Sequence, residues 1–133
     1  MEVICRDVRE IDDVSFIKRF EDKYDIEFSK DFISFMKLNN GGIPLKKQVE
    51  LAGDLYEVRC FLSFFDDEYN SIGKPLESFQ KKTKGKIIPF AIDSGDNYFC
   101  LNLDTEKIYY WDREDDLFYL LSNSFTEFVS NLL

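Results

Sequence analysis

The sequence predicts an α+β domain in which an antiparallel-rich β-meander sheet has about four helices packed on one face. Residues 87–121 contain short apolar segments separated by connections of about four residues, which are too short for parallel crossovers. Helical spacing of apolar residues occurs on both sides of this region, near residues 13–39 and 124–133. Helices at both ends of a chain and a meander between them favour a sheet with a helical layer.

The first helix is indicated by a cap and by apolar spacing. Asp12 or Asp13 can serve as its N-cap, because a short carboxylate accepts hydrogen bonds from the free N–H groups of the first turn. Ile17, Phe20 and Tyr24 then follow at a spacing that places all three on one face of a helix. This face is predicted to be buried.

A second helix is expected after Ser29, which is a suitable N-cap. Phe32, Phe35 and Met36 form its apolar stripe. The segment Asn40-Gly41-Gly42 ends it, since Asn and Gly readily adopt the left-handed conformation found after helices.

The middle of the chain predicts one strand and one short helix. Residues 56–65 have β-forming composition, with Val58, Cys60 and Leu62 on one face, and acidic residues 66–68 follow. Residues 75–82 are expected to form a short helix opened by Pro75, with Leu76 and Phe79 turned inward.

The meander is predicted from strands at 87–92, 98–103, 108–112 and 117–121. The first connection, residues 93–97, carries Asp, Gly and Asn, which tolerate the backbone angles of tight turns. A last helix is expected to begin at Ser124, with Glu127 completing a capping box. Its apolar stripe must lie on another element and comprises Phe125, Phe128, Val129, Leu132 and Leu133.

Composition narrows the possible functions. A chain of 133 residues with 44% hydrophobic and 32% charged residues is long enough for one domain with a sizeable core. It contains no histidine, which excludes His-based catalysis and His-ligated metal sites. Its three cysteines are widely spaced, so free buried thiols are expected. Carboxylate-based chemistry is not excluded by this composition, but no metal or cofactor site is expected, because acidic clusters between strands are typical of turns. The absence of a long apolar run favours a cytoplasmic protein that does not bind membranes.

Negative charge is concentrated in the last third of the chain. Residues 87–133 carry nine acidic and two basic side chains, out of a net charge of −9 for the whole protein. This balance disfavours nucleic acid and suits a basic protein partner, although it is also compatible with a role in solubility alone. The candidate partner-binding residues lie in two predicted turns and are Asp66, Asp67, Glu68, Asp112, Glu114, Asp115 and Asp116.

Several segments, taken in order, carry a family resemblance. They are residues 28–32 with Asn40-Gly41-Gly42, then Ile88-Pro89-Phe90-Ala91, Gly95-Asp96-Asn97 and Cys100-Leu101-Asn102-Leu103, and finally Tyr110-Trp111-Asp112 and residues 124–129. In this combination the chain resembles the SUKH superfamily, which includes bacterial immunity proteins of polymorphic toxin systems and yeast regulators of cell-wall assembly. Ser29 departs from the Pro that the family often has, but both residues suit a helix start.

The resemblance implies that residues 1–133 form a single SUKH-like domain that binds proteins and catalyses no reaction. A compact chain of this size resembles the immunity branch, in which the partner is a toxin domain, often a nuclease or another enzyme, whose active site is blocked. The alternative within the family is an intracellular scaffold or regulator of cell-wall assembly or signalling. Sequence alone leaves the oligomeric state open.

Overall fold

The computed structural model describes residues 3–66 and 70–133. Within these residues the helices are α1 (Val14–Tyr24), α2 (Lys30–Asn39), α3 (Gly73–Thr83) and α4 (Phe125–Ser130). The strands are β1 (Cys5–Arg6), β2 (Ile43–Pro44), β3 (Gln48–Leu51), β4 (Asp54–Phe61), β5 (Ile87–Asp93), β6 (Tyr98–Asn102), β7 (Ile108–Asp112) and β8 (Leu117–Ser122). The described helices are each too short and too polar to cross a membrane.

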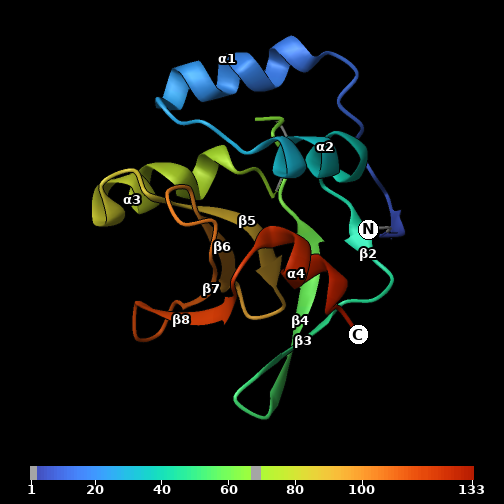
Figure 1. The fold of residues 1–133 in the computed structure, drawn as a ribbon, viewed down its shortest axis with the longest axis vertical. Helices are drawn as coiled ribbons and strands as arrows, with labels where there is room; N and C mark the ends of the chain where they lie inside the picture. The colour runs from blue at the N-terminus through green and yellow to red at the C-terminus, as the bar shows by residue number, and fades with distance from the viewer. Residues whose placement is uncertain (1–2, 67–69) are drawn as a thin grey trace.

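The main sheet has six strands in the order β3-β4-β5-β6-β7-β8, and every pair of neighbours is antiparallel. β1 and β2 form a separate two-stranded sheet. Figure 1 shows the strongly curved main sheet with helices around it. The α+β class and the antiparallel meander of residues 87–121 are therefore confirmed. Strands β1, β2 and β3 were not predicted from the sequence.

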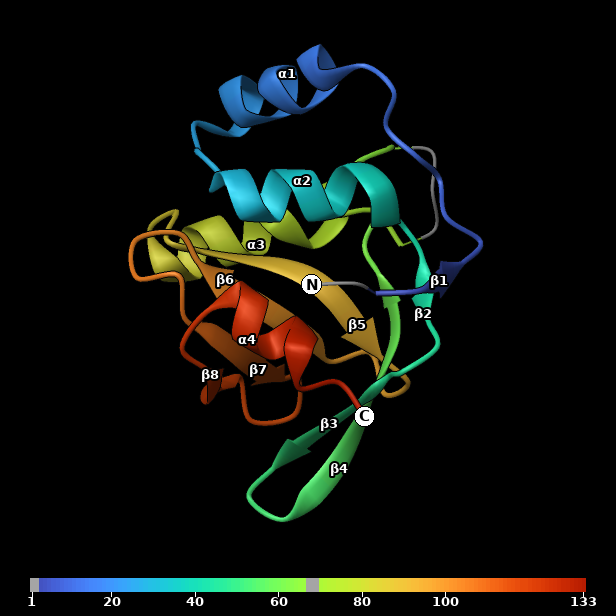
Figure 2. The ribbon, with the colours of Figure 1, turned by 45° about the vertical axis from the view of Figure 1, so that its right-hand side comes forward.

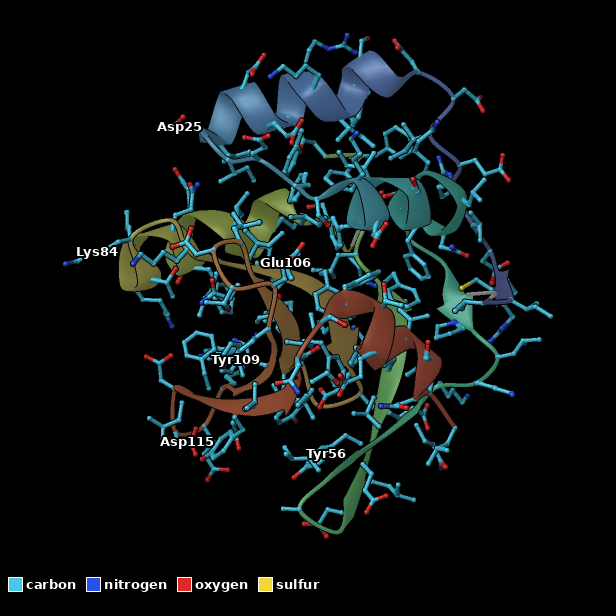
Figure 3. The ribbon with its side chains drawn as sticks, in the orientation of Figure 1. Asp25, Tyr56, Lys84, Glu106, Tyr109 and Asp115 are labelled. Carbon is cyan, nitrogen blue, oxygen red and sulfur yellow. The ribbon has the colours of Figure 1, made fainter. Side chains whose placement is uncertain are left out.

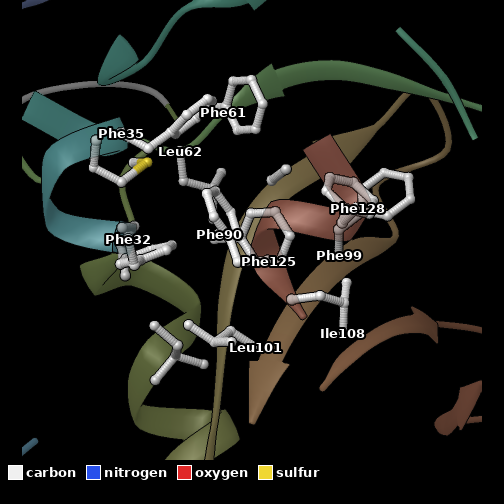
Figure 4. Packing of buried hydrophobic residues seen from close by; sticks show 14 of the residues in the cluster. Phe32, Phe35, Phe61, Leu62, Phe90, Phe99, Leu101, Ile108, Phe125 and Phe128 are labelled. Atoms are coloured by element: carbon white, nitrogen blue, oxygen red, sulfur yellow. The ribbon is translucent and has the colours of Figure 1, made fainter. Parts of the chain in front are cut away.

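The main core lies between the sheet and the helical layer formed by α2 and α4. The ring of Phe125 on α4 lies 5.0 Å from the rings of both Phe32 and Phe35 on α2, and 5.3 Å from Phe90 on β5. Figure 4 shows these rings meeting at the centre of the core. Helix α1 lies on the outer side of α2, away from the sheet (Figure 2). The predicted packing of the last helix on the sheet is therefore correct.

Helix α3 contributes to two clusters. Its Leu76 joins the main core, whereas Phe79 packs against Cys100 and Trp111 in a smaller cluster. Trp111 and its neighbour Tyr110 point to opposite faces of the sheet because side chains alternate along a strand. Phe79 therefore also covers part of the sheet face that lies opposite the main core.

Three helix caps were predicted correctly. Asp13 accepts a hydrogen bond from Ser15 N (2.9 Å), Ser29 accepts one from Phe32 N (3.3 Å), and Ser124 accepts one from Glu127 N (3.1 Å). α4 ends at Ser130, and the predicted stripe residue Leu133 is exposed. The reason is that Leu133 continues as extended chain, with its backbone bonded to Gln48.

The middle of the chain differs from prediction at two boundaries. β4 ends at Phe61 instead of residue 65, because Ser63 turns away from the sheet and bonds through its backbone to Asn70 and Ile72. α3 begins at Gly73, which places Pro75 inside its first turn instead of at its start. Proline is tolerated there because the N–H groups of a first helical turn have no partner within the helix.

The Asn40-Gly41-Gly42 segment joins three parts of the chain. Asn40 is completely buried, and its amide donates to Arg9 O (3.0 Å) and Ser63 Oγ (3.1 Å) and accepts from Phe64 N (2.8 Å). Gly42 is required by space, since a Cβ there would lie 2.9 Å from side-chain atoms of Cys5 and Val8. The end of α2 is thereby fixed both to the N-terminal segment and to the chain that follows β4.

We predict that Asn40→Ala destabilises the protein by about 2–4 kcal/mol, because the completely buried amide loses its hydrogen bonds to Arg9, Ser63 and Phe64. Urea unfolding followed by circular dichroism measures this effect. The control is Asn123→Ala at an exposed position, which should change the free energy of unfolding by less than about 0.5 kcal/mol. Equal effects of the two substitutions would contradict the proposed role of Asn40.

Candidate functional site

The β7–β8 turn, residues 113–116, carries the first group of predicted contact residues. Asp112 begins the turn, and its carboxylate accepts a hydrogen bond from Glu114 N (2.9 Å) while its carbonyl accepts one from Asp116 N (2.8 Å). Asp116 has a φ of 56°, a left-handed conformation that Asp tolerates better than most residues. Asp112 and Asp116 are therefore part of the turn's structure as well as of its charge.

Asp116 connects this turn to α3. Its Oδ1 accepts hydrogen bonds from Lys82 Nζ and from Trp111 Nε1, both at 2.6 Å. The Lys82 ammonium also lies 4.8 Å from the centre of the Trp111 ring, a cation–π distance. The bond from Lys82, followed by that from Trp111, lowers the pKa of Asp116. Asp116 thus stays charged in mild acid and is held against the protein.

Asp115 and Glu114 differ in how freely their side chains project. Asp115 accepts from Leu117 N (2.9 Å) and from the Tyr119 hydroxyl, and the latter bond is the main reason that the pKa of Tyr119 is raised. Figure 3 shows Asp115 at the outer tip of the β7–β8 turn. Glu114 is exposed, and its carboxylate makes no hydrogen bond or ion pair with the described residues. Glu114 is the most available charge of the turn.

The second predicted group of acidic residues lies elsewhere. Asp66 is exposed and sits beside Gly73, where α3 begins, whereas Asp116 is bonded to Lys82 in the last turn of the same helix. Gly73 and Lys82 are nine residues apart on this helix, a distance of about 14 Å at 1.5 Å per residue. Asp67 and Glu68 lie outside the described residues. The structure does not join Asp66 to the acidic turn in one site.

The strand after the acidic turn carries exposed apolar side chains that sequence reasoning missed. Leu117, Tyr119 and Leu120 on β8 are 54%, 38% and 50% exposed. The aromatic residues of the neighbouring strand β7 are less accessible, since Tyr110 and Trp111 are buried and Tyr109 is half-buried. The signal in the sequence was the apolar run of residues 117–121, in which no polar residue marks a solvent-facing side.

The β5–β6 turn lies beside the β7–β8 turn and is built around the buried carboxylate of Asp93. Its Oδ1 accepts from Gly95 N and Asn97 N, both at 2.8 Å, and its Oδ2 accepts from the Tyr110 hydroxyl at 2.6 Å. Burial and then this bond raise the pKa of Tyr110. These bonds hold the β5–β6 turn together and connect it to Tyr110 on β7.

The two turns are bonded to each other. Asn97 Oδ1 accepts from Arg113 N (2.8 Å), and the Arg113 guanidinium donates to Asp96 O at 3.1 and 3.0 Å. Asp96 also pairs with Arg59 at 3.6 Å. The result is one acidic end of the sheet with a fixed backbone, in which Arg113 and Lys82 neutralise part of the charge.

Other chemistry is sparse in the part of the chain that the structure describes. No group of three or more Cys, Asp or Glu side chains there could hold a metal ion. Cys5, Cys60 and Cys100 are free thiols, as the sequence predicted, but only Cys60 and Cys100 are buried and Cys5 is half-buried. Burial raises the pKa of all three, to about 11 for Cys5, so the reactive thiolate is disfavoured at neutral pH.

Comparison with known proteins gives two matches. The model of the SMI1 / KNR4 family (SUKH-1) matches residues 13–131. The chain is also 37% identical over 71 residues to the SPbeta prophage-derived uncharacterized protein YokK of Bacillus subtilis (strain 168). This second match spans 50% of the chain and only 37% of the length of that relative.

The single tryptophan, Trp111, provides a test of the Asp116 interaction. Because the pKa of Asp116 is lowered from 3.8, its stabilising effect should be complete above pH 3.8 and be lost as the pH falls through the lowered value. We expect Trp111 fluorescence to be constant from pH 7 to about 4 and to change below that range. Asp116→Asn should remove this component. A change in Trp111 fluorescence above pH 4, or a fluorescence change below pH 4 that persists in Asp116→Asn, would contradict the interaction.

Proposed function

Since the chain belongs to the SMI1/KNR4 family (SUKH-1), we propose that it is a non-catalytic protein-binding domain, and specifically an immunity protein that binds and neutralises a cognate polymorphic toxin. The observation that carries this proposal is the family match, which extends over residues 13–131. The toxin is the expected partner because the superfamily includes immunity proteins of such systems.

The acidic end of the sheet supports a basic protein as the partner. Glu114 projects without a described partner, and the exposed Leu117 and Tyr119 lie directly beside the turn that carries it. Interfaces combine an apolar centre with a polar rim, and a charged rim accelerates encounter with a partner of opposite sign. Nucleic acid would meet a surface of the same sign as its phosphates.

The use of the buried polar groups supports a non-catalytic role. Asp93 organises a turn, Asn40 joins three segments, and Glu21 accepts a hydrogen bond from Phe28 N at 2.8 Å. Each of these groups therefore has a structural task, and the chain contains no histidine to act as a proton shuttle.

Co-expression tests the proposal directly. The candidate toxin domains encoded by neighbouring genes are expressed with and without the chain, and we expect the chain to restore growth with one of them and to form a stable complex with it on size-exclusion chromatography. An abundant, folded chain that neither protects cells nor binds the toxin would refute the immunity role. Binding to proteins of cell-wall assembly or signalling instead would support the alternative, an intracellular scaffold or regulator.

Glu114→Lys tests the contribution of the acidic turn. This change should slow association with a basic toxin domain about three- to tenfold at low salt, and the difference should shrink as salt is added. Stopped-flow or surface plasmon resonance measures the rate. Glu106→Lys is the matched control, because it makes the same charge change in the β6–β7 turn at the other end of the strands. Equal effects of both variants would show that only net charge matters.

A further inference from the structure

The two edges of the main sheet are protected differently. At the β3 edge, Lys47 N and Gln48 N both donate to Leu133 O at 3.1 Å, and Leu133 N donates to Gln48 O at 3.1 Å. β3 also carries the polar residues Gln48 and Glu50. At the other edge, β8 pairs with β7 alone among the described strands. The start of β3 is therefore paired with Leu133, whereas one side of β8 has no strand partner among the described residues.

β8 lacks the features that normally prevent an edge strand from pairing with another chain. Its sequence, Leu-Phe-Tyr-Leu-Leu-Ser, contains no charged residue and no proline. Figures 1 and 2 show β8 at the margin of the molecule. The N–H of Leu117 is bonded to Asp115, so the open backbone begins at Phe118. An exposed apolar edge of this kind is a binding site for an extended segment.

Apolar side chains extend from both faces of β8. Tyr119 is the cross-strand partner of Tyr110 and Leu120 is the partner of Tyr109, so Tyr119 and Leu120 point to opposite sides of the sheet. Both are at least one-third exposed. An added strand would therefore place alternate side chains against an exposed apolar residue on each face.

We propose that β8 is the docking strand for the partner, which adds an extended segment with apolar residues and flanking basic residues to the sheet. This inference rests on the proposed function and specifies its binding mode. The acidic turn before β8 carries Asp112, Glu114, Asp115 and Asp116 against Arg113 and Lys82, so positive charge is favoured beside the strand.

There is room beside the end of β8 for an added segment, and charge favours a partner over a second copy of this chain. Leu121 and Ser122 line a cleft of about 390 Å³ together with Val49, Glu50 and Ala52 of the β3 side, so the end of β8 has room beside it. Two copies would each carry a net charge of −9 and would repel each other on approach. A basic segment would be attracted to the same surface.

Hydrogen exchange provides a test that requires no substitution. Amide exchange of the chain is measured alone and in complex with the toxin domain identified by the co-expression experiment. Because N–H groups along a strand point alternately to its two edges, only the amides of residues 118–121 that face away from β7 are open. We expect these amides to gain at least about tenfold protection in the complex, as amides do when they enter a β-ladder. A complex with unchanged exchange in β8 would overturn this inference while leaving the immunity role intact. The absence of any complex would overturn both, and a dimer of the chain paired through β8 would assign the edge to a second copy.

A matched pair of variants adds a test by affinity. Leu120→Lys places a charge on the open edge at a position that is already 50% exposed, and it should weaken binding at least about tenfold. Leu38→Lys, on α2 at 65% exposure, is the control and should leave affinity within about twofold. Thermal melting verifies that both variants fold. Equal affinities of the two folded variants would overturn the assignment of β8.

Discussion

The buried carboxylate of Asp93 fixes the end of the sheet on which the proposed function depends. It accepts two backbone N–H groups of its own turn and the Tyr110 hydroxyl of a strand two positions away in the sheet. A buried charge is tolerated when it is surrounded by such donors. The Asn97 side chain donates a hydrogen bond to Asp93 and accepts one from Arg113 N. Asp93 therefore also helps to position the neighbouring turn.

Most acidic residues of the β7–β8 turn have a structural role in addition to their charge. Asp112, Asp115 and Asp116 each accept a hydrogen bond that shapes the β7–β8 turn, so their presence has a structural cause independent of any partner. Glu114 has no such task among the described residues. Charge and conformation therefore come from the same sequence segment, and only part of its charge is available for recognition.

Much of the fold could be predicted from local patterns. The caps at Asp13, Ser29 and Ser124 were readable because a cap depends on residues within one helical turn. β3 and the end of β4 could not be predicted from the sequence, because both depend on residues far away in the chain. β3 is bonded to Leu133, and the chain after β4 is bonded to residues 70–72. The site was predicted only in part for the same reason. Sequence showed where carboxylates cluster, but not that Asp66 lies at the other end of α3 or that β8 is an open edge.

The order of strands in the sheet also determines how the chain can fold. Each strand of the six-stranded sheet pairs with its neighbour in the sequence, and β5 to β8 are joined by short turns, so these hairpins close with little loss of loop entropy. The contacts of Phe125 with Phe32 and Phe35 connect segments near opposite ends of the chain and close a much longer loop. During synthesis the meander can therefore form before α4 has emerged, whereas the main core is completed only when the final helix reaches α2.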